Sequence, residues 1–188
     1  MSNNYSTQND LLLTNLLQFY KTDNNMDKML GIINGESRIS LRIIDWFATN
    51  YAKKYYTVYQ MEGTEPHINN RFKVYNDYKL KLKAYSKKRF DPFCRWDRIT
   101  IPYKQDAHVQ TTIGQLNFFK WAIENNVIHY IEQNYTTIEK DMNNRNSTSK
   151  VRNTETNSNK TRKKREELSV SAAKSIKKEK VEIVVKFN

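Results

Sequence analysis

The sequence predicts an α+β fold, a small and mainly antiparallel sheet between residues 55 and 103 with helices at 40–54 and 113–142. Three observations support this prediction. Apolar residues recur at helical spacing in both flanking segments. From Tyr78 to Ala84, apolar residues alternate with lysines, as in a strand with one solvated face. After Met142 apolar residues almost disappear, which predicts a basic, disordered C-terminal tail.

The length of 188 residues suits one domain with a hydrophobic core plus additional segments. We expect an N-terminal helical extension at residues 1–35, an α+β core domain at 36–142 and a mostly disordered tail at 143–188. The tail ends in a strand-like segment, Val181–Phe187, that can pair with a sheet edge in its own chain or in a partner.

The sequence of the N-terminal extension predicts two short helices. Asp10 can cap the first, whose apolar positions from Leu12 to Tyr20 follow helical spacing. The second covers Met26 to Ile33 and ends at Asn34-Gly35.

The core domain is expected to begin with a helix. Large apolar residues follow helical spacing up to Tyr55, although Ile39, Leu41 and Ile43 also alternate as in a strand. We favour a helix that starts near Ser40.

Three strands are expected next. Tyr55–Met61 is rich in residues that favour strands, and Phe72–Tyr85 contains the alternating lysines. Residues 86–98 suit a long ordered loop, after which Ile99–Tyr103 returns as a short strand. Thr112 and Gln115 then have the spacing of a capping box, which predicts the start of two helices joined at Asn125-Asn126.

The net charge of +12 is concentrated in two segments. Residues 36–104 contain 15 basic and 7 acidic side chains, and residues 143–188 contain 13 and 5. Such a distribution indicates a polyanionic partner and does not specify a fold.

The densest basic segment, residues 78–98, contains eight cations and five aromatic rings. Cations attract phosphate and aromatic rings can stack on bases, so we expect nucleic-acid binding here. The candidate residues are Lys79, Lys81, Lys83, Lys87, Lys88, Arg89, Arg95, Trp96 and Arg98.

Each of these features also has a structural interpretation. Lysines on a solvated strand face can protect a sheet edge from aggregation. The loop aromatics Phe90, Phe93 and Trp96 can be buried beneath the loop, and for Trp96 we favour burial over stacking.

The tail contains a second basic cluster. Lys160, Arg162, Lys163, Lys164 and Arg165 match clusters that serve nuclear import or nucleic-acid binding, although a merely solvated tail has the same composition.

We predict no catalytic residue, metal site or cofactor. The histidines have no metal-ligand spacing with Cys94, and the four glycines form no phosphate-binding loop. Asp45, Asp77, Asp91 and Asp97 could assemble a magnesium nuclease site, but their spacing does not single them out.

Three segments together resemble an uncharacterised protein family of nucleocytoplasmic large DNA viruses and related giant viruses. They are Ser40–Tyr51 (SLRIIDWFATNY), Leu82–Arg95 (LKAYSKKRFDPFCR) and Thr112–Asn126 (TIGQLNFFKWAIENN). The resemblance covers residues 36–142. It implies a DNA virus that replicates in a eukaryotic host, and it implies no particular activity.

We therefore expect a non-catalytic nucleic-acid-binding protein that acts in DNA packing or transcription, with DNA favoured over RNA. The alternative is a virion or assembly protein whose basic surface binds an acidic protein, and the third choice is a small metal-dependent nuclease. A single cysteine and the lack of a long apolar run predict a soluble intracellular protein without membrane partners. The expected location is the cytoplasmic viral factory or the virion, with the host nucleus as an alternative.

Overall fold

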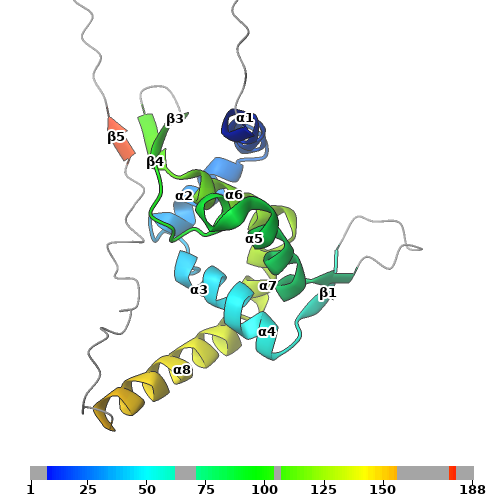
Figure 1. Ribbon diagram of the computed structural model, residues 1–188, viewed down its shortest axis with the longest axis vertical. Helices are drawn as coiled ribbons and strands as arrows, with labels where there is room; N and C mark the ends of the chain where they lie inside the picture. The colour runs from blue at the N-terminus through cyan, green and yellow to red at the C-terminus, as the bar shows by residue number, and fades with distance from the viewer. Residues whose placement is uncertain (1–7, 62–70, 104–106, 156–177, 181–188) are drawn as a thin grey trace, which may run out of the picture.

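A computed structural model describes residues 8–61, 71–103, 107–155 and 178–180, with side chains as far as residue 145 in the third range. In chain order, the elements are α1 (Gln8–Tyr20), α2 (Asn25–Ile33), α3 (Leu41–Trp46), the π-helical turn η1 (Phe47–Tyr51), α4 (Ala52–Lys54), β1 (Val58–Gln60), β2 (Arg71–Lys73), α5 (Val74–Phe90), β3 (Ile99–Tyr103), β4 (Ala107–Thr111), α6 (Ile113–Glu124), α7 (Val127–Gln133), α8 (Tyr135–Glu155) and β5 (Lys178–Lys180) (Figure 1).

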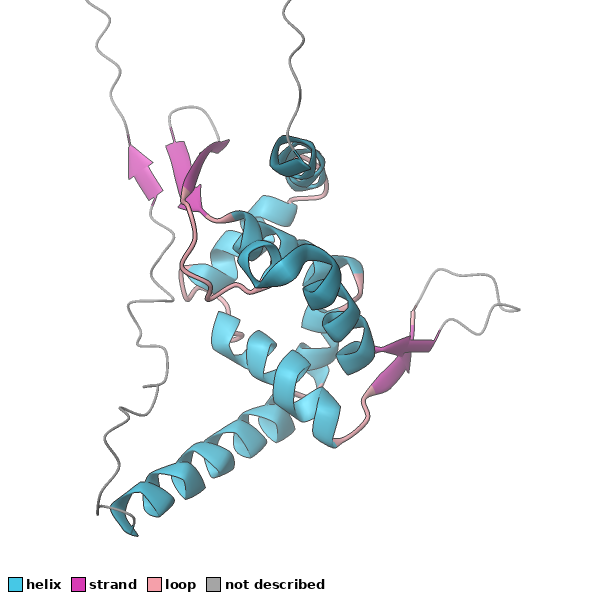
Figure 2. Ribbon diagram, viewed as in Figure 1, coloured by secondary structure: helices cyan, strands magenta, loops and turns pink. Residues whose placement is uncertain are grey.

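The α+β prediction is confirmed, with helices forming the body and short antiparallel strands lying at its periphery (Figure 2). β1 pairs with β2, with Tyr59 opposite Phe72. A separate sheet has the order β3-β4-β5, with Ile101 opposite Val109 and Ala107 opposite Lys180. The strand at Ile99–Tyr103 is confirmed as β3, whereas its partner β4 was not predicted.

The strand predicted at Phe72–Tyr85 is wrong, because residues 74–90 form helix α5. Val74 and Tyr78 lie one helical turn apart and are both buried, as is Phe90 at the end of the helix. The helical spacing of these residues was hidden by the alternating lysines. Packing along α6 decides between the two patterns, because a helix buries this apolar stripe against another helix.

α5 is interrupted near its end. Ser86 has φ 65° and ψ 164°, a backbone conformation that almost only glycine adopts. The interruption redirects the chain so that Phe90 enters the core, where its ring packs against Tyr78, Tyr85 and Phe118.

α6 lies at the centre of the core. The N-cap of the predicted capping box begins it, since Thr112 Oγ1 accepts a hydrogen bond from the Gln115 backbone N–H at 3.2 Å. The Gln115 side chain instead accepts from the Thr111 hydroxyl at 3.1 Å. The helix predicted from Ser40 is likewise confirmed, because the Ser40 hydroxyl accepts from the Ile43 N–H at 3.3 Å. The last predicted helical region forms two helices, α7 and α8, after the turn at Asn125-Asn126.

The N-terminal helices belong to the same core as α6. Leu16 and Met29 are buried in it, and the Tyr20 hydroxyl donates a 2.6 Å hydrogen bond to the Leu116 carbonyl. Asp10, predicted as a cap, lies inside the first turn of α1.

At the other end of the chain, α8 continues to Glu155, past the boundary predicted at Met142. Figure 1 shows α8 projecting away from the body. The segment Val181–Phe187 lies outside the described residues. No helix in the described ranges has both the length and the apolarity needed to cross a membrane.

Candidate nucleic-acid interface

Three consecutive cations at the end of α5 point in different directions. Lys87 Nζ lies 3.4 Å from Asp91 Oδ2, and Lys88 Nζ lies 3.7 Å from the ring centroid of Trp96. Arg89 donates from one terminal nitrogen to Gln8 Oε1 at 2.9 Å. Lys87 and Lys88 are exposed, whereas Arg89 is half-buried beside α1.

The loop after α5 begins with a turn built on Asp91. Its Oδ1 accepts from the Phe93 N–H at 2.8 Å, and its carbonyl accepts from the Cys94 N–H at 3.1 Å. The chain then emerges into solvent, so all four residues from Arg95 to Arg98 are exposed.

The favoured burial of Trp96 is wrong, since 37% of this side chain is exposed. Phe90 occupies the aromatic core instead and is fully buried. Trp96 therefore contacts the ammonium group of Lys88 at the surface, in a cation–π geometry. Arg95 and Arg98 flank it in sequence. We call Lys88, Arg95, Trp96 and Arg98 the Lys88–Trp96 surface.

The lysines of α5 do not share one face, because a period of two is not the period of a helix. Lys79 and Lys83 lie one turn apart and line a shallow depression with Leu80 and Leu82. Lys81 lines a different pocket, on the side of α1 and α6. The common lysine face required by the strand prediction is therefore not formed.

The four candidate nuclease aspartates do not come together in one site, although Asp45 and Asp91 lie close enough for their charges to interact. Asp77 accepts a 2.7 Å hydrogen bond from Trp121 Nε1, and Asp97 lies in the exposed part of the loop. Burial, followed by the nearby charge of Asp91, raises the pKa of Asp45 to about 7, although Lys87 opposes the shift. Among the described residues, no three His, Cys, Asp or Glu side chains are grouped so as to hold a metal ion.

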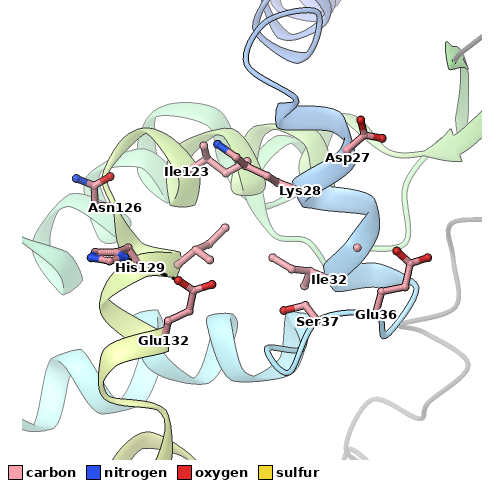
Figure 3. Close-up of a pocket in the computed structure, with 11 residues that line it drawn as sticks. Asp27, Lys28, Ile32, Glu36, Ser37, Ile123, Asn126, His129 and Glu132 are labelled. Carbon is pink, nitrogen blue, oxygen red and sulfur yellow. Dashed lines mark ion pairs between the residues drawn. The ribbon is translucent and has the colours of Figure 1, made fainter.

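A pocket of about 430 Å³ lies between α2 and α7 (Figure 3). Three carboxylates, from Asp27, Glu36 and Glu132, line it together with Lys28 and His129. This acidic lining is opposite in character to a phosphate-binding site.

A second basic surface, on α4 and α8, was missed by the sequence predictions. Its signal is the four-residue spacing of Thr136, Lys140 and Asn144, which places polar side chains on one helical stripe. In the sequence, the apolar periodicity of the same segment, which includes Ile138, obscures this polar stripe. The predicted tail cluster, from Lys160 to Arg165, lies outside the described residues.

Comparison with known proteins agrees with the giant-virus resemblance. Residues 2–187 match the sequence model of a family described as "Family of unknown function (DUF7197)". The chain is 42% identical over 156 residues to "Uncharacterized protein L507" of Acanthamoeba polyphaga mimivirus, an alignment that covers 76% of this chain and 60% of that protein. No solved structure matches significantly. With nearly its whole length matched, this chain belongs to the family of unknown function DUF7197.

Proposed function

We propose that the protein is a non-catalytic nucleic-acid-binding protein and that the Lys88–Trp96 surface contacts a single-stranded nucleic acid. The observation that supports this most directly is the exposed indole of Trp96 beside the ammonium of Lys88, 3.7 Å from the ring centroid. Proteins that bind single strands combine aromatic platforms for bases with cations for the phosphate backbone. Both groups are present within this short segment.

In this proposal, Trp96 stacks on an unpaired base, and Lys88, Arg95 and Arg98 neutralise neighbouring phosphates. Lys79 and Lys83, one helical turn apart, extend the positive charge along the exposed side of α5. Because the relative is a protein of a giant virus, we propose DNA over RNA as the partner, with a role in DNA packing or transcription. The corresponding locations are the cytoplasmic viral factory, the virion or the host nucleus.

The substitution Trp96→Ala tests the proposal in the full chain. Loss of a stacked base is expected to weaken binding to a single-stranded oligonucleotide by about 1–3 kcal/mol, or roughly 5- to 150-fold in Kd. Tm is expected to change little, because the ring is exposed and outside the core. Fluorescence anisotropy measures the affinity and calorimetry measures Tm.

The matched control is Lys21→Gln, which alters an exposed cation at the end of α1, away from the loop. Its affinity is expected to remain close to that of the wild type. Equal affinities for Trp96→Ala and the wild type would contradict the stacking role.

A second candidate function is supported by the outer side of α5. Leu80 is 65% exposed there, and Lys79 and Lys83 flank it in the same shallow depression. An apolar and basic surface of this kind suits an acidic protein partner in virion assembly. The test measures binding of the protein to an acidic polypeptide. If Leu80→Ser weakens this binding and Trp96→Ala leaves it unchanged, the result favours the assembly function over nucleic-acid binding.

A further inference from the structure

A small pocket of about 110 Å³ lies where α1, α5 and α6 meet. Its apolar lining includes the buried side chains of Leu16, Phe90 and Trp121, one from each helix. Its polar lining includes Asn15 of α1, Lys81 of α5, and Asn117 and Asn125 of α6. Apolar walls with a few polar side chains are the usual composition of a ligand-binding site. We call this site the Lys81 pocket.

Lys81 gives the pocket a positive charge that its neighbours do not neutralise. In the described part of the chain its ammonium group has no hydrogen bond and no ion pair, and the residue is half-buried. The other lysine of the pocket, Lys120, lies 3.6 Å from Glu124, measured from Nζ to Oε1. Withdrawing an ammonium group from water without a partner is unfavourable, so Lys81 gains from an acceptor on a ligand.

The two asparagines of α6 are oriented by hydrogen bonds to backbone carbonyls. Asn117 Nδ2 donates to the Arg89 carbonyl at 3.0 Å, and Asn125 Nδ2 donates to the Trp121 carbonyl at 2.8 Å. These bonds fix the orientation of both amides and leave their Oδ1 atoms as acceptors. The pocket therefore combines a charged donor with amide acceptors.

This combination matches the edge of a pyrimidine base. A pyrimidine has carbonyl oxygens that accept from an ammonium group and N–H groups that donate to amide oxygens. A closed cavity of about 150 Å³ holds benzene. A pocket of about 110 Å³ that opens to solvent therefore suits one six-membered ring better than the two fused rings of a purine.

The Lys81 pocket and the Lys88–Trp96 surface belong to the same junction of α5 and α6. Gly114, in the first turn of α6, lies against the backbone carbonyl of Lys88. Asn117 follows three residues later on α6 and lines the pocket. The Arg89 carbonyl, next to Lys88 in the chain, holds the amide of Asn117 in place.

We propose that the Lys81 pocket receives a pyrimidine base of a bound single strand. Lys81 donates to a carbonyl oxygen of the base, and Asn117 and Asn125 accept from its N–H groups. The inference rests on the proposed function, because it adds base selectivity to strand binding. Phosphate contacts at the Lys88–Trp96 surface supply affinity for any sequence, whereas contacts to a base edge discriminate among sequences.

The test measures how strongly the full chain prefers oligodeoxythymidylate over oligodeoxyadenylate of the same length. Lys81→Met keeps most of the aliphatic side chain and removes the ammonium group. It is expected to reduce the preference about tenfold, since a hydrogen bond from a charged group contributes at this level. Lys83→Met is the matched control, because it removes the same charge from α5 at a residue that lines a different depression. It is expected to leave the preference unchanged.

A second variant tests the pocket without a change of charge. Asn15 is exposed and has no hydrogen bond in the described ranges, so Asn15→Trp is expected to fold normally and to narrow the pocket. The preference for oligodeoxythymidylate is expected to fall in this variant as well. Strand flexibility alone can favour pyrimidines, but that contribution is the same in every variant. A preference that is absent in the unmodified chain, or equal in the Lys81→Met and Lys83→Met variants, would overturn the pocket and leave strand binding intact.

Free deoxythymidine separates this inference from the proposed function. It contains no phosphate, so its binding does not require the cations of the Lys88–Trp96 surface. If the chain binds neither oligonucleotide, the proposed function fails, and equilibrium dialysis with deoxythymidine decides the pocket. Binding that Lys81→Met abolishes and Lys83→Met preserves would then support the pocket. Absence of deoxythymidine binding would then overturn it.

Discussion

Asp45 lies half-buried on α3, close to the carboxylate of Asp91 and the ammonium of Lys87. Its pKa of about 7 in the folded protein exceeds the value of 3.8 expected for an exposed Asp. Between these pH values the folded state holds a proton that the unfolded state releases. The free energy of unfolding contributed by Asp45 is therefore greatest below about pH 4 and is lost as pH rises to about 7.

The substitution Asp45→Asn is expected to remove this part of the pH dependence. Each unit of pKa shift corresponds to about 1.4 kcal/mol, so the wild type should lose about 2 kcal/mol of stability between pH 5 and pH 7 through this residue. Urea unfolding at several pH values measures the difference from the variant. Parallel stability curves for the two proteins would show that Asp45 titrates normally.

Single residues also show what the sequence could not reveal. Trp96 was expected to be buried because Phe90, Pro92 and Phe93 supply apolar neighbours. The conformation of Ser86 instead directs Phe90 into the core and leaves the tryptophan outside. A serine gives no sequence signal for a backbone conformation typical of glycine, so the exposure of Trp96 could not be predicted from composition.

At the scale of elements, the junction of α5 and α6 depends on a glycine. A Cβ atom at Gly114 would lie 2.9 Å from the Asp91 carbonyl oxygen and 3.1 Å from that of Lys88. Both neighbours are backbone atoms, so they cannot move aside as a flexible side chain can. This close approach holds the start of the Lys88–Trp96 surface against the first turn of α6.

The substitution Gly114→Ala is expected to destabilise the protein by about 1–3 kcal/mol, the usual cost of overpacking. Gly31→Ala is the matched control, because its Cβ would meet only the end of the Glu36 side chain at 3.9 Å. Within helix α2, alanine is expected to stabilise by up to about 1 kcal/mol. Chemical denaturation measures both variants. A neutral effect of Gly114→Ala would mean that α5 and α6 can separate without cost.

The elements were predictable where capping and periodicity agreed. Ser40 and Thr112 begin helices as their capping signals indicate. α5 was not predictable in this way, because Tyr78 to Ala84 satisfy a period of two while Val74 and Tyr78 satisfy a helical period. Only contact with α6 resolves the conflict, and that contact connects segments far apart in the sequence.

At the scale of the whole molecule, the basic charge is distributed over more than one side. The predicted single lysine face is replaced by the Lys88–Trp96 surface, the exposed side of α5 and the second basic surface, on α4 and α8. The helices predicted as an extension are part of the core, because Leu16, Tyr20 and Met29 are buried in it. Charge composition therefore predicts a class of partner, whereas the way the charges are grouped on the surface is seen only in the fold.

The salt dependence of binding tests the central claim most directly. Three proteins are titrated with a single-stranded oligonucleotide, and the first is the unchanged full chain. The second is a triple variant with Lys88, Arg95 and Arg98 changed to Gln. The third is a control triple variant with Lys21, Lys28 and Lys53 changed to Gln. All three proteins retain the tail. Each phosphate contact on a single strand contributes about 0.7 to the slope of log affinity against log salt concentration. We predict that the slope of the first variant falls by about 2 while that of the control stays near the wild-type value. Equal slopes for the two triple variants would contradict the account.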